Sequence, residues 1–301
     1  MNTTARELDF LSPELVEEGR PPSMLRGVLR TTEGKVGLAL GVFMLALIIL
    51  GPFIAPYPPT QIAAGPPASG PSAAHLLGTD PLGRDMLSRF LTGGRSVLLV
   101  PLAAVLLSLG VGGALGMLGA YRPGTPDQVI VRGFDLVMAL PALLIVLVLI
   151  AGLGTSVMVV ILTVALVFAP RMGRVVRGAA QSVVLSDYVS AAQLRGESTG
   201  WILGRELLPN VAGPVLATFA LYLTYAIIFV ATLSFLGLGA QPPSSDWGLM
   251  VAESRSFFAL NPWATLAPAL GIAALSVAFT LLADAVNRHL SRGTDRPETA
   301  V

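Results

Sequence analysis

The sequence predicts an all-α polytopic membrane protein with six transmembrane helices and both termini in the cytoplasm. The chain of 301 residues is 53% hydrophobic and 12% charged, and its mean hydropathy is +0.74. These values are too apolar for a soluble globular domain. A bilayer core about 30 Å thick needs about 20 apolar residues per helix. Six segments have that length: 36–56, 96–120, 133–151, 155–176, 211–236 and 264–286.

The distribution of basic residues predicts the orientation of these spans. Cytoplasmic loops of membrane proteins carry an excess of Lys and Arg. With both termini inside, only four of the 19 Lys and Arg residues fall outside, which leaves 15 inside. The four are Arg84, Arg89, Arg95 and Arg255. The chain then divides into a cytoplasmic tail (1–35), a first span (36–56), an extracytoplasmic connection (57–95), a core of five spans (96–288) with a cytoplasmic loop (178–210), and a second cytoplasmic tail (289–301).

The outer connection begins with a Pro- and Gly-rich stretch and continues as an amphipathic segment over residues 75–95. Asp80, Arg84, Asp85 and Arg89 follow one another at spacings that would let them pair along a short helix at the outer interface. Solvated interfacial charges, each contributing little to stability, are the commoner explanation of such a pattern. The residue types alone leave both interpretations open.

Small residues and prolines mark the next three spans. Gly112 and Gly116 form a G-x-x-x-G pattern, which allows close helix packing but occurs equally in flexible helices. Pro141 and Pro170 each remove a backbone donor and can kink their helices. Only residues 152–156 separate the third span from the fourth, so we expect a tight helical hairpin there.

Charged residues near the helix ends predict anchoring of the helices at the membrane surface more than substrate contacts or proton transfer. Arg171, Arg174 and Arg177 recur every third residue toward the cytoplasmic end of the fourth span, where snorkelling anchors are more common than substrate contacts. Asp135 and Asp284 also lie near cytoplasmic helix ends, so no carboxylate relay within the membrane is evident.

Several negative observations argue against an enzyme. Lys35 is the only lysine and is followed by valine, so the chain cannot contain the phosphate-binding loop G-x-x-x-x-G-K-[ST]. There is no cysteine, and the two histidines, His75 and His289, are predicted on opposite sides of the membrane. We therefore predict no metal site, no catalytic residues and no cofactor. The basic residues are spread over membrane flanks, which gives no indication of nucleic-acid binding.

A polar segment at residues 188–210 lies between the fourth and fifth apolar spans. We expect Ser186 or Asp187 to cap a short helix that ends near Leu194, and Gly196 to allow a sharp turn. A second short helix is expected at about residues 199–207, and Pro209 suits the first turn of the fifth span. An ordinary surface loop would explain any one of these features, but together they predict a docking element for a soluble partner.

This segment resembles the EAA loop of ATP-binding-cassette (ABC) importer permeases. Three further blocks are similar to the C-type permeases of dipeptide, oligopeptide and nickel importers: HLLGTDPLGRDMLSR (75–89), RGFDLVMALPALL (132–144) and LSFLGLGAQPPSSDWG (233–248). The resemblance extends from the first span to about residue 287. It implies the type I ABC importer permease fold in the bacterial cytoplasmic (inner) membrane.

The resemblance also implies partners and site residues. A second homologous permease subunit, two ABC ATPase subunits that bind ATP and Mg, an extracytoplasmic substrate-binding protein and membrane lipid would surround the chain. The ATPase-coupling residues would be Asp187, Tyr188, Ser190, Ala191, Ala192, Gly196, Glu197, Glu206, Leu208, Pro209 and Asn210. The extracytoplasmic family motif would comprise Gly78, Thr79, Asp80, Gly83, Arg84 and Asp85. Contacts with the pathway or the binding protein would come from Ser234, Asp246 and Trp247, although Trp247 equally suits an interfacial anchor.

Two departures from the family pattern concern the coupling segment. Ser190 stands where the family usually has Glu, and Glu206 stands where it usually has His. We hypothesise that Glu197 or Glu206 supplies the missing charge. The scarcity of His, Cys and membrane-centred carboxylates favours peptides as the solute. Nickel or another small solute is an alternative, and an ATP-independent secondary transporter is a more distant one.

Overall fold

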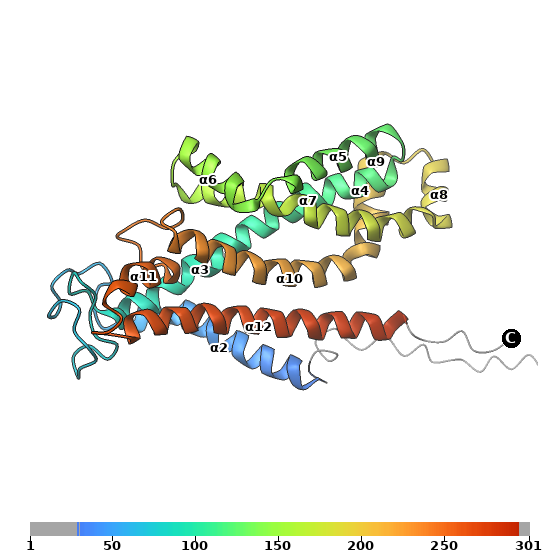
Figure 1. Cartoon of the computed structure of the whole chain (residues 1–301). Helices are drawn as coiled ribbons and strands as arrows, with labels where there is room; N and C mark the ends of the chain where they lie inside the picture. The colour runs from blue at the N-terminus through green and yellow to red at the C-terminus, as the bar shows by residue number, and fades with distance from the viewer. Residues whose placement is uncertain (1–28, 30, 295–301) are drawn as a thin grey trace, which may run out of the picture.

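The computed structural model describes residue 29 and residues 31–294, with side chains up to residue 288 (Figure 1). The predicted tails at 1–35 and 289–301 therefore lie largely outside the described residues. In the described part the protein is built almost entirely of helices. In chain order they are α2 (Thr32–Ile54), α3 (Met86–Ser108), η2 (Leu109–Gly113), α4 (Ala114–Tyr121), α5 (Thr125–Ala139), α6 (Ala142–Leu153), α7 (Val157–Val184), α8 (Asp187–Leu194), α9 (Thr199–Trp201), η3 (Ile202–Leu207), α10 (Leu208–Phe235), α11 (Trp247–Ser254), η4 (Arg255–Phe257) and α12 (Trp263–Thr294).

Five helical stretches in this part of the chain are long and apolar enough to cross a membrane, and a bent pair of helices would make a sixth. This confirms an all-α polytopic membrane protein. The five stretches are Thr32–Ile54, Met86–Tyr121, Val157–Val184, Thr199–Phe235 and Trp263–Arg288. The second begins ten residues earlier than predicted, because the Asp85 side chain accepts a hydrogen bond from the Ser88 amide and caps α3 there.

The third span is broken in two. Residues 133–151, predicted as one span that Pro141 could kink, fall in α5 and α6, which meet at an angle of 86°. Leu140 has an extended backbone, with φ −92° and ψ 140°. The following Pro141 favours this conformation and supplies no amide to continue the helix. The expected hairpin between the third and fourth spans is present: α6 ends at Leu153, and Ser156 caps α7. Pro170 lies inside α7 without interrupting it.

The two ends of the bundle carry different structures. Figure 1 shows the connection between α2 and α3 gathered beside α11 at one end, which we call the loop end. The short helix α8 lies at the opposite end, which we call the α8 end. Three clusters of buried apolar side chains fill the length between them. Met44, Trp247 and Leu275 belong to the cluster at the loop end, and Val189 and Ile202 to the cluster at the α8 end.

The G-x-x-x-G pattern forms a packing seam within the chain. A Cβ atom at Gly112 would overlap the carbonyl oxygen of Ala169, and one at Gly116 would overlap that of Gly173, both on α7. Beside them, the Ser108 hydroxyl donates to the Ala165 carbonyl at 3.1 Å. Close approach of η2 and α4 to α7 therefore requires glycine at these positions.

We expect Gly116→Ala to lower the stability of the chain by about 1–3 kcal/mol, since the added methyl group has no space against α7. The matched control is Gly110→Ala in the neighbouring η2. No atom would lie within 4 Å of the new Cβ atom there, so stability should be unchanged or slightly raised. Thermal unfolding of the detergent-solubilised protein measures both. Equal midpoints for the two variants would contradict the seam.

Candidate functional site

At the loop end, Asp80 is the centre of a buried polar network. Its Oδ1 atom accepts hydrogen bonds from the amides of Leu82 and Arg84 at 2.8 and 2.9 Å. Its Oδ2 atom pairs with the Arg84 guanidinium and accepts from Arg89 Nη1 at 2.7 Å. Asp80 and Arg89 are each 0% exposed. Burying a carboxylate without such donors would be costly.

Glu253 on α11 completes the network. It accepts hydrogen bonds from Arg84 Nη2 at 3.0 Å and from Arg89 Nη2 at 2.8 Å. Two carboxylates thus balance two guanidinium groups, and the pairs connect the loop, α3 and α11. We refer to Asp80, Arg84, Arg89 and Glu253 as the loop-end clasp. Sequence reasoning missed Glu253; the excess of arginine over aspartate in residues 75–95 was the available indication that another carboxylate was needed.

The clasp corrects both sequence interpretations of these charges. They are not solvated interfacial groups, because the side chains of Asp80, Arg84 and Arg89 are buried. They do not pair along one helix either, since Asp80 and Arg84 precede α3. An isolated Thr79–Asp85 bridge closes a turn, in which Gly78 and Gly83 have φ values of +72° and +71°. Glycine adopts this backbone conformation without strain.

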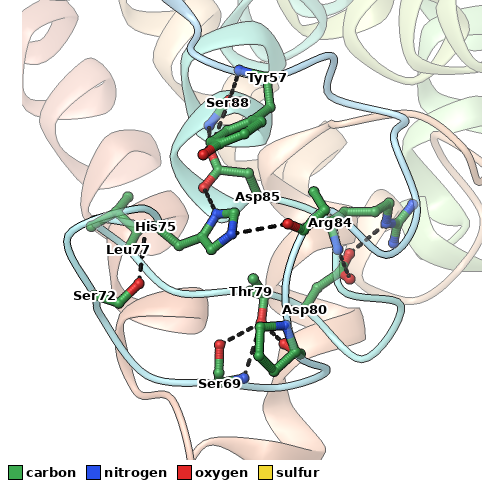
Figure 2. A network of polar contacts seen from close by, with 12 residues as sticks. Tyr57, Ser69, Ser72, His75, Leu77, Thr79, Asp80, Arg84, Asp85 and Ser88 are labelled. Atoms are coloured by element: carbon green, nitrogen blue, oxygen red, sulfur yellow. Dashed lines mark hydrogen bonds and ion pairs between the residues drawn. The ribbon is translucent and has the colours of Figure 1, made fainter.

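Next to the clasp, His75 and Asp85 form a second buried pair. Figure 2 shows His75 pointing toward Asp85, and their Nδ1 and Oδ1 atoms are 2.9 Å apart. The other ring nitrogen lies 3.2 Å from the Ala64 carbonyl oxygen. Thr79 contacts Ser69 and Pro66 in the same loop. Asn261, which sequence reasoning also missed, donates to the carbonyl oxygens of Ser69 and Leu77 at 3.1 and 2.9 Å. These contacts hold the connection between α2 and α3 in one conformation.

The structure places Ser234, Asp246 and Trp247 inside this end of the chain. Trp247 is 0% exposed, stacks on Phe90 and donates from Nε1 to the Phe90 carbonyl at 2.8 Å. It is therefore not an anchor at the membrane surface. Asp246 caps α11 and accepts from the Ser96 hydroxyl at 2.8 Å. Ser234 is buried and accepts from the Ala240 amide at 3.2 Å. Of the three, Asp246 also borders a hollow of 370 Å³.

At the α8 end, the chain folds into the predicted short helix and turn. Gly196 has φ +77°, as a turn at this position requires. Ser186 is the N-cap residue, as predicted, but its side chain makes no capping hydrogen bond. Asp187 lies in the first turn, where a carboxylate interacts favourably with the helix dipole. The second expected helix is not separate, since α9 and η3 continue directly into α10. Pro209 lies in the first turn of α10, as predicted.

The two faces of α8 have different environments. Val189 and Ala192 are buried against Val176 and Ile202. Ala192 thus packs within the chain, so of the two alanines expected on an outward face only Ala191 is exposed. The outward side instead carries Tyr188 and Leu194, which are 41% and 90% exposed. Leu185, which follows the end of α7 and precedes α8, is 84% exposed.

The other predicted coupling residues lie around α8 and the start of α10. Arg195 Nη2 is 4.0 Å from Glu206, and Arg195 Nε is 3.9 Å from Glu197. Both carboxylates are therefore near a basic group of the same chain, at separations that make weak pairs. The Asn210 amide donates to the Glu206 carbonyl at 2.6 Å. The remaining members are exposed: Ser190, Leu208, Pro209 and Asn210.

Two of the three arginines in the second half of α7 do more than anchor the helix. Arg174 pairs with Asp135, and Arg177 pairs with Asp127 at 2.6 Å. Both aspartates belong to α5, so these ion pairs connect α5 to α7. Sequence reasoning placed Arg174 and Arg177 at the membrane surface without partners.

An apolar helical bundle with an ion-paired loop at one end and a short, partly exposed helix at the other defines a polytopic membrane protein. The comparison with known proteins identifies its family. Residues 112–296, more than half of the chain, match the family described as binding-protein-dependent transport system inner membrane component, and the chain belongs to this family.

Similar proteins cover nearly the whole chain. It is 34% identical over 279 residues to the di/tripeptide transport system permease protein DppC of Pseudomonas aeruginosa, covering 89% of this chain and 92% of that protein. It is 35% identical to the glutathione transport system permease protein GsiD of Pectobacterium atrosepticum, with 85% and 86% covered. It is 35% identical to the probable D,D-dipeptide transport system permease protein DdpC of Escherichia coli, with 87% of each covered.

Proposed function

We propose that this chain is the permease subunit of an ATP-driven, binding-protein-dependent importer of peptides. The observation that carries the proposal is its similarity, over more than four-fifths of its length, to permeases named for dipeptides, tripeptides and glutathione. With a second homologous permease subunit, the chain would form half of a pathway across the bacterial inner membrane.

The α8 end would contact two cytoplasmic ATPase subunits. Leu185, Tyr188 and Leu194 expose apolar surface there that a protein partner could bury. The orientation follows from the excess of basic residues on this side. ATP and Mg would bind to the ATPases, since this chain lacks the phosphate-binding loop that such chemistry uses.

The packing of α8 provides a route for coupling. Its inward residues Val189 and Ala192 belong to the same buried cluster as Ile202 of η3 and Val211 of α10. Because a close-packed cluster moves as a unit, a displacement of α8 by the ATPases would reach α10 and α7. At the other end, the loop held by the clasp would face the extracytoplasmic binding protein.

The experiment that tests the proposal is mass-spectrometric identification of proteins that co-purify with the tagged chain from mildly solubilised native membranes. We expect a second six-span permease and an ATPase with a Walker A sequence. The purified assembly, with its binding protein, should import peptide only with ATP. A chain that purifies alone and moves solute without ATP would indicate a secondary transporter. Import of nickel in place of peptide would indicate the alternative solute.

We expect Glu206→Ala to weaken association with the ATPase more than Ser190→Ala does. Glu206 is a partly buried carboxylate near Arg195, whereas Ser190 is an exposed hydroxyl on α8. Loss of the carboxylate should cost about 1 kcal/mol, or about fivefold in affinity. A pull-down of the ATPase at several concentrations measures the difference. Gln193→Ala, on α8 like Ser190, is the control. Equal or reversed effects would exclude Glu206 as the compensating charge.

A further inference from the structure

Arg171 differs from the two arginines that follow it along α7. Arg174 and Arg177 have carboxylate partners, whereas Arg171 has none within salt-bridge distance among the residues that the structure describes. Its Nη1 atom donates to the Val167 carbonyl at 2.7 Å, and its guanidinium lies 6.0 Å from the centre of the Phe168 ring. An arginine has five N–H donors, so most of its hydrogen-bonding capacity is left for another group.

The depth of Arg171 makes its lack of a carboxylate significant. It follows Val157, the first residue of α7, by 14 positions, or about 21 Å along the helix. That distance lies within a hydrocarbon core about 30 Å thick. Tyr222 on the neighbouring α10 precedes the last residue of that helix by 13 positions, about 20 Å, and so lies at the same depth. An unpaired charge at this depth is costly and usually serves a function.

Arg171 borders a hollow of 490 Å³ formed by α6, α7 and α10. Its walls are mainly apolar and aromatic. Phe168 makes edge-to-face contacts with Tyr222 and Phe229 at 5.9 and 5.8 Å between ring centres. The polar groups on the walls are the Arg171 guanidinium and the hydroxyl groups of Tyr222, Tyr225 and Thr232, with no carboxylate among the lining residues. Tyr225 is 50% exposed, so the hollow is open to the outside of this chain.

We propose that this hollow binds the carboxylate of the peptide while the peptide crosses the membrane. This inference rests on the proposed importer function. A guanidinium binds a carboxylate through two parallel hydrogen bonds, and tyrosine hydroxyls can donate to the same group. The apolar walls would accommodate short apolar side chains, and the positive charge would disfavour a metal cation. The hollow would therefore select for anionic termini at a level within the hydrocarbon core, where an unpaired anion is costly.

A labelling experiment tests the hollow without involving the binding protein. The chain contains no cysteine, so Ile228→Cys introduces one thiol at the wall of the hollow, at a position that is 48% exposed. In the full permease–ATPase complex without binding protein, millimolar trialanine should slow modification of this thiol about fivefold or more. Trialanine with a C-terminal amide should have almost no effect, because the amide carries no charge to pair with Arg171.

Substitutions of Arg171 connect this protection to the guanidinium. In the Ile228→Cys background, Arg171→Gln should abolish protection by trialanine, and Arg171→Lys should retain part of it. Arg174→Gln, one turn along the same helix, is the matched control and should keep full protection. In the cysteine-free chain, Arg171→Gln should lower ATP-driven uptake of trialanine about tenfold, equivalent to about 1.4 kcal/mol, whereas Arg174→Gln should change uptake less than twofold.

Three outcomes would overturn the inference. Equal protection by trialanine and its amide would show that the carboxylate is not recognised. Labelling of Ile228→Cys that neither peptide slows, in an importer that takes up trialanine, would show that the hollow is not on the path. Loss of the second permease from the complex in Arg171→Gln would show that Arg171 pairs with a carboxylate of that subunit. Absence of any ATP-driven peptide uptake by the wild-type assembly would instead contradict the importer function itself.

Discussion

Leu194→Asp is expected to lower ATP-driven uptake at least about a hundredfold while the chain remains folded in the membrane. Leu194 ends α8 and is 90% exposed, and Leu185, just before the start of α8, is 84% exposed. If the ATPase covers this surface, the substitution buries an unpaired carboxylate, which costs several kcal/mol. A loss of about 2.8 kcal/mol corresponds to a hundredfold change in affinity. Pull-down of the ATPase and uptake into proteoliposomes measure the effect.

The matched control is Leu76→Asp, which makes the same change at the loop end, where Leu76 is 63% exposed. This variant should bind the ATPase as the wild type does. Wild-type recovery of the ATPase with Leu194→Asp would show that α8 is not the contact. A point substitution is more informative than deletion of residues 188–206, because the deletion would also remove Val189 and Ile202 from the buried cluster.

Asp80→Asn should destabilise the chain by about 3–5 kcal/mol, since it leaves two buried guanidinium groups with one remaining carboxylate. The asparagine amide has nearly the same shape, so the loss is of charge more than of volume. For a chain of this size we expect the thermal midpoint of the detergent-solubilised protein to fall by on the order of 10 °C.

Asp135→Asn provides the control for this prediction. It makes the same substitution in the ion pair with Arg174, whose side chains are 43% and 53% exposed. Exposed pairs contribute about 0–1 kcal/mol, so the midpoint should hardly change. A fall of similar size in both variants would show that the clasp contributes no more than an ordinary surface pair.

The fold could be predicted from the sequence because the length of an apolar run determines whether a helix can cross a bilayer. The bend at Pro141 could not be predicted, because a proline inside an apolar run can either bend the helix or be tolerated. Pro170 is tolerated within α7. Which outcome occurs depends on the packing of neighbouring helices.

The site was predictable where it depends on local sequence and unpredictable where it depends on distant contacts. The turn at Gly196 and the short helix α8 follow from neighbouring residues. The burial of Arg89 depends on Glu253, which is 164 positions away along the chain. Trp247 was expected either as a contact with the pathway or the binding protein or as an anchor at the membrane surface, but the space left by the small residues Gly93, Gly94 and Gly271 lets its ring pack inside.

The bend between α5 and α6 has a consequence for ion leakage. After the bend, α6 continues for 12 residues, or about 18 Å. Ala142, the first residue of α6, also borders the hollow that contains Arg171. The amides at the start of a helix carry a partial positive charge, which here adds to that of the guanidinium. The electrostatic potential at this level would oppose the passage of protons and metal ions. An importer that opens to admit an anionic peptide terminus could thereby preserve the proton gradient across the membrane.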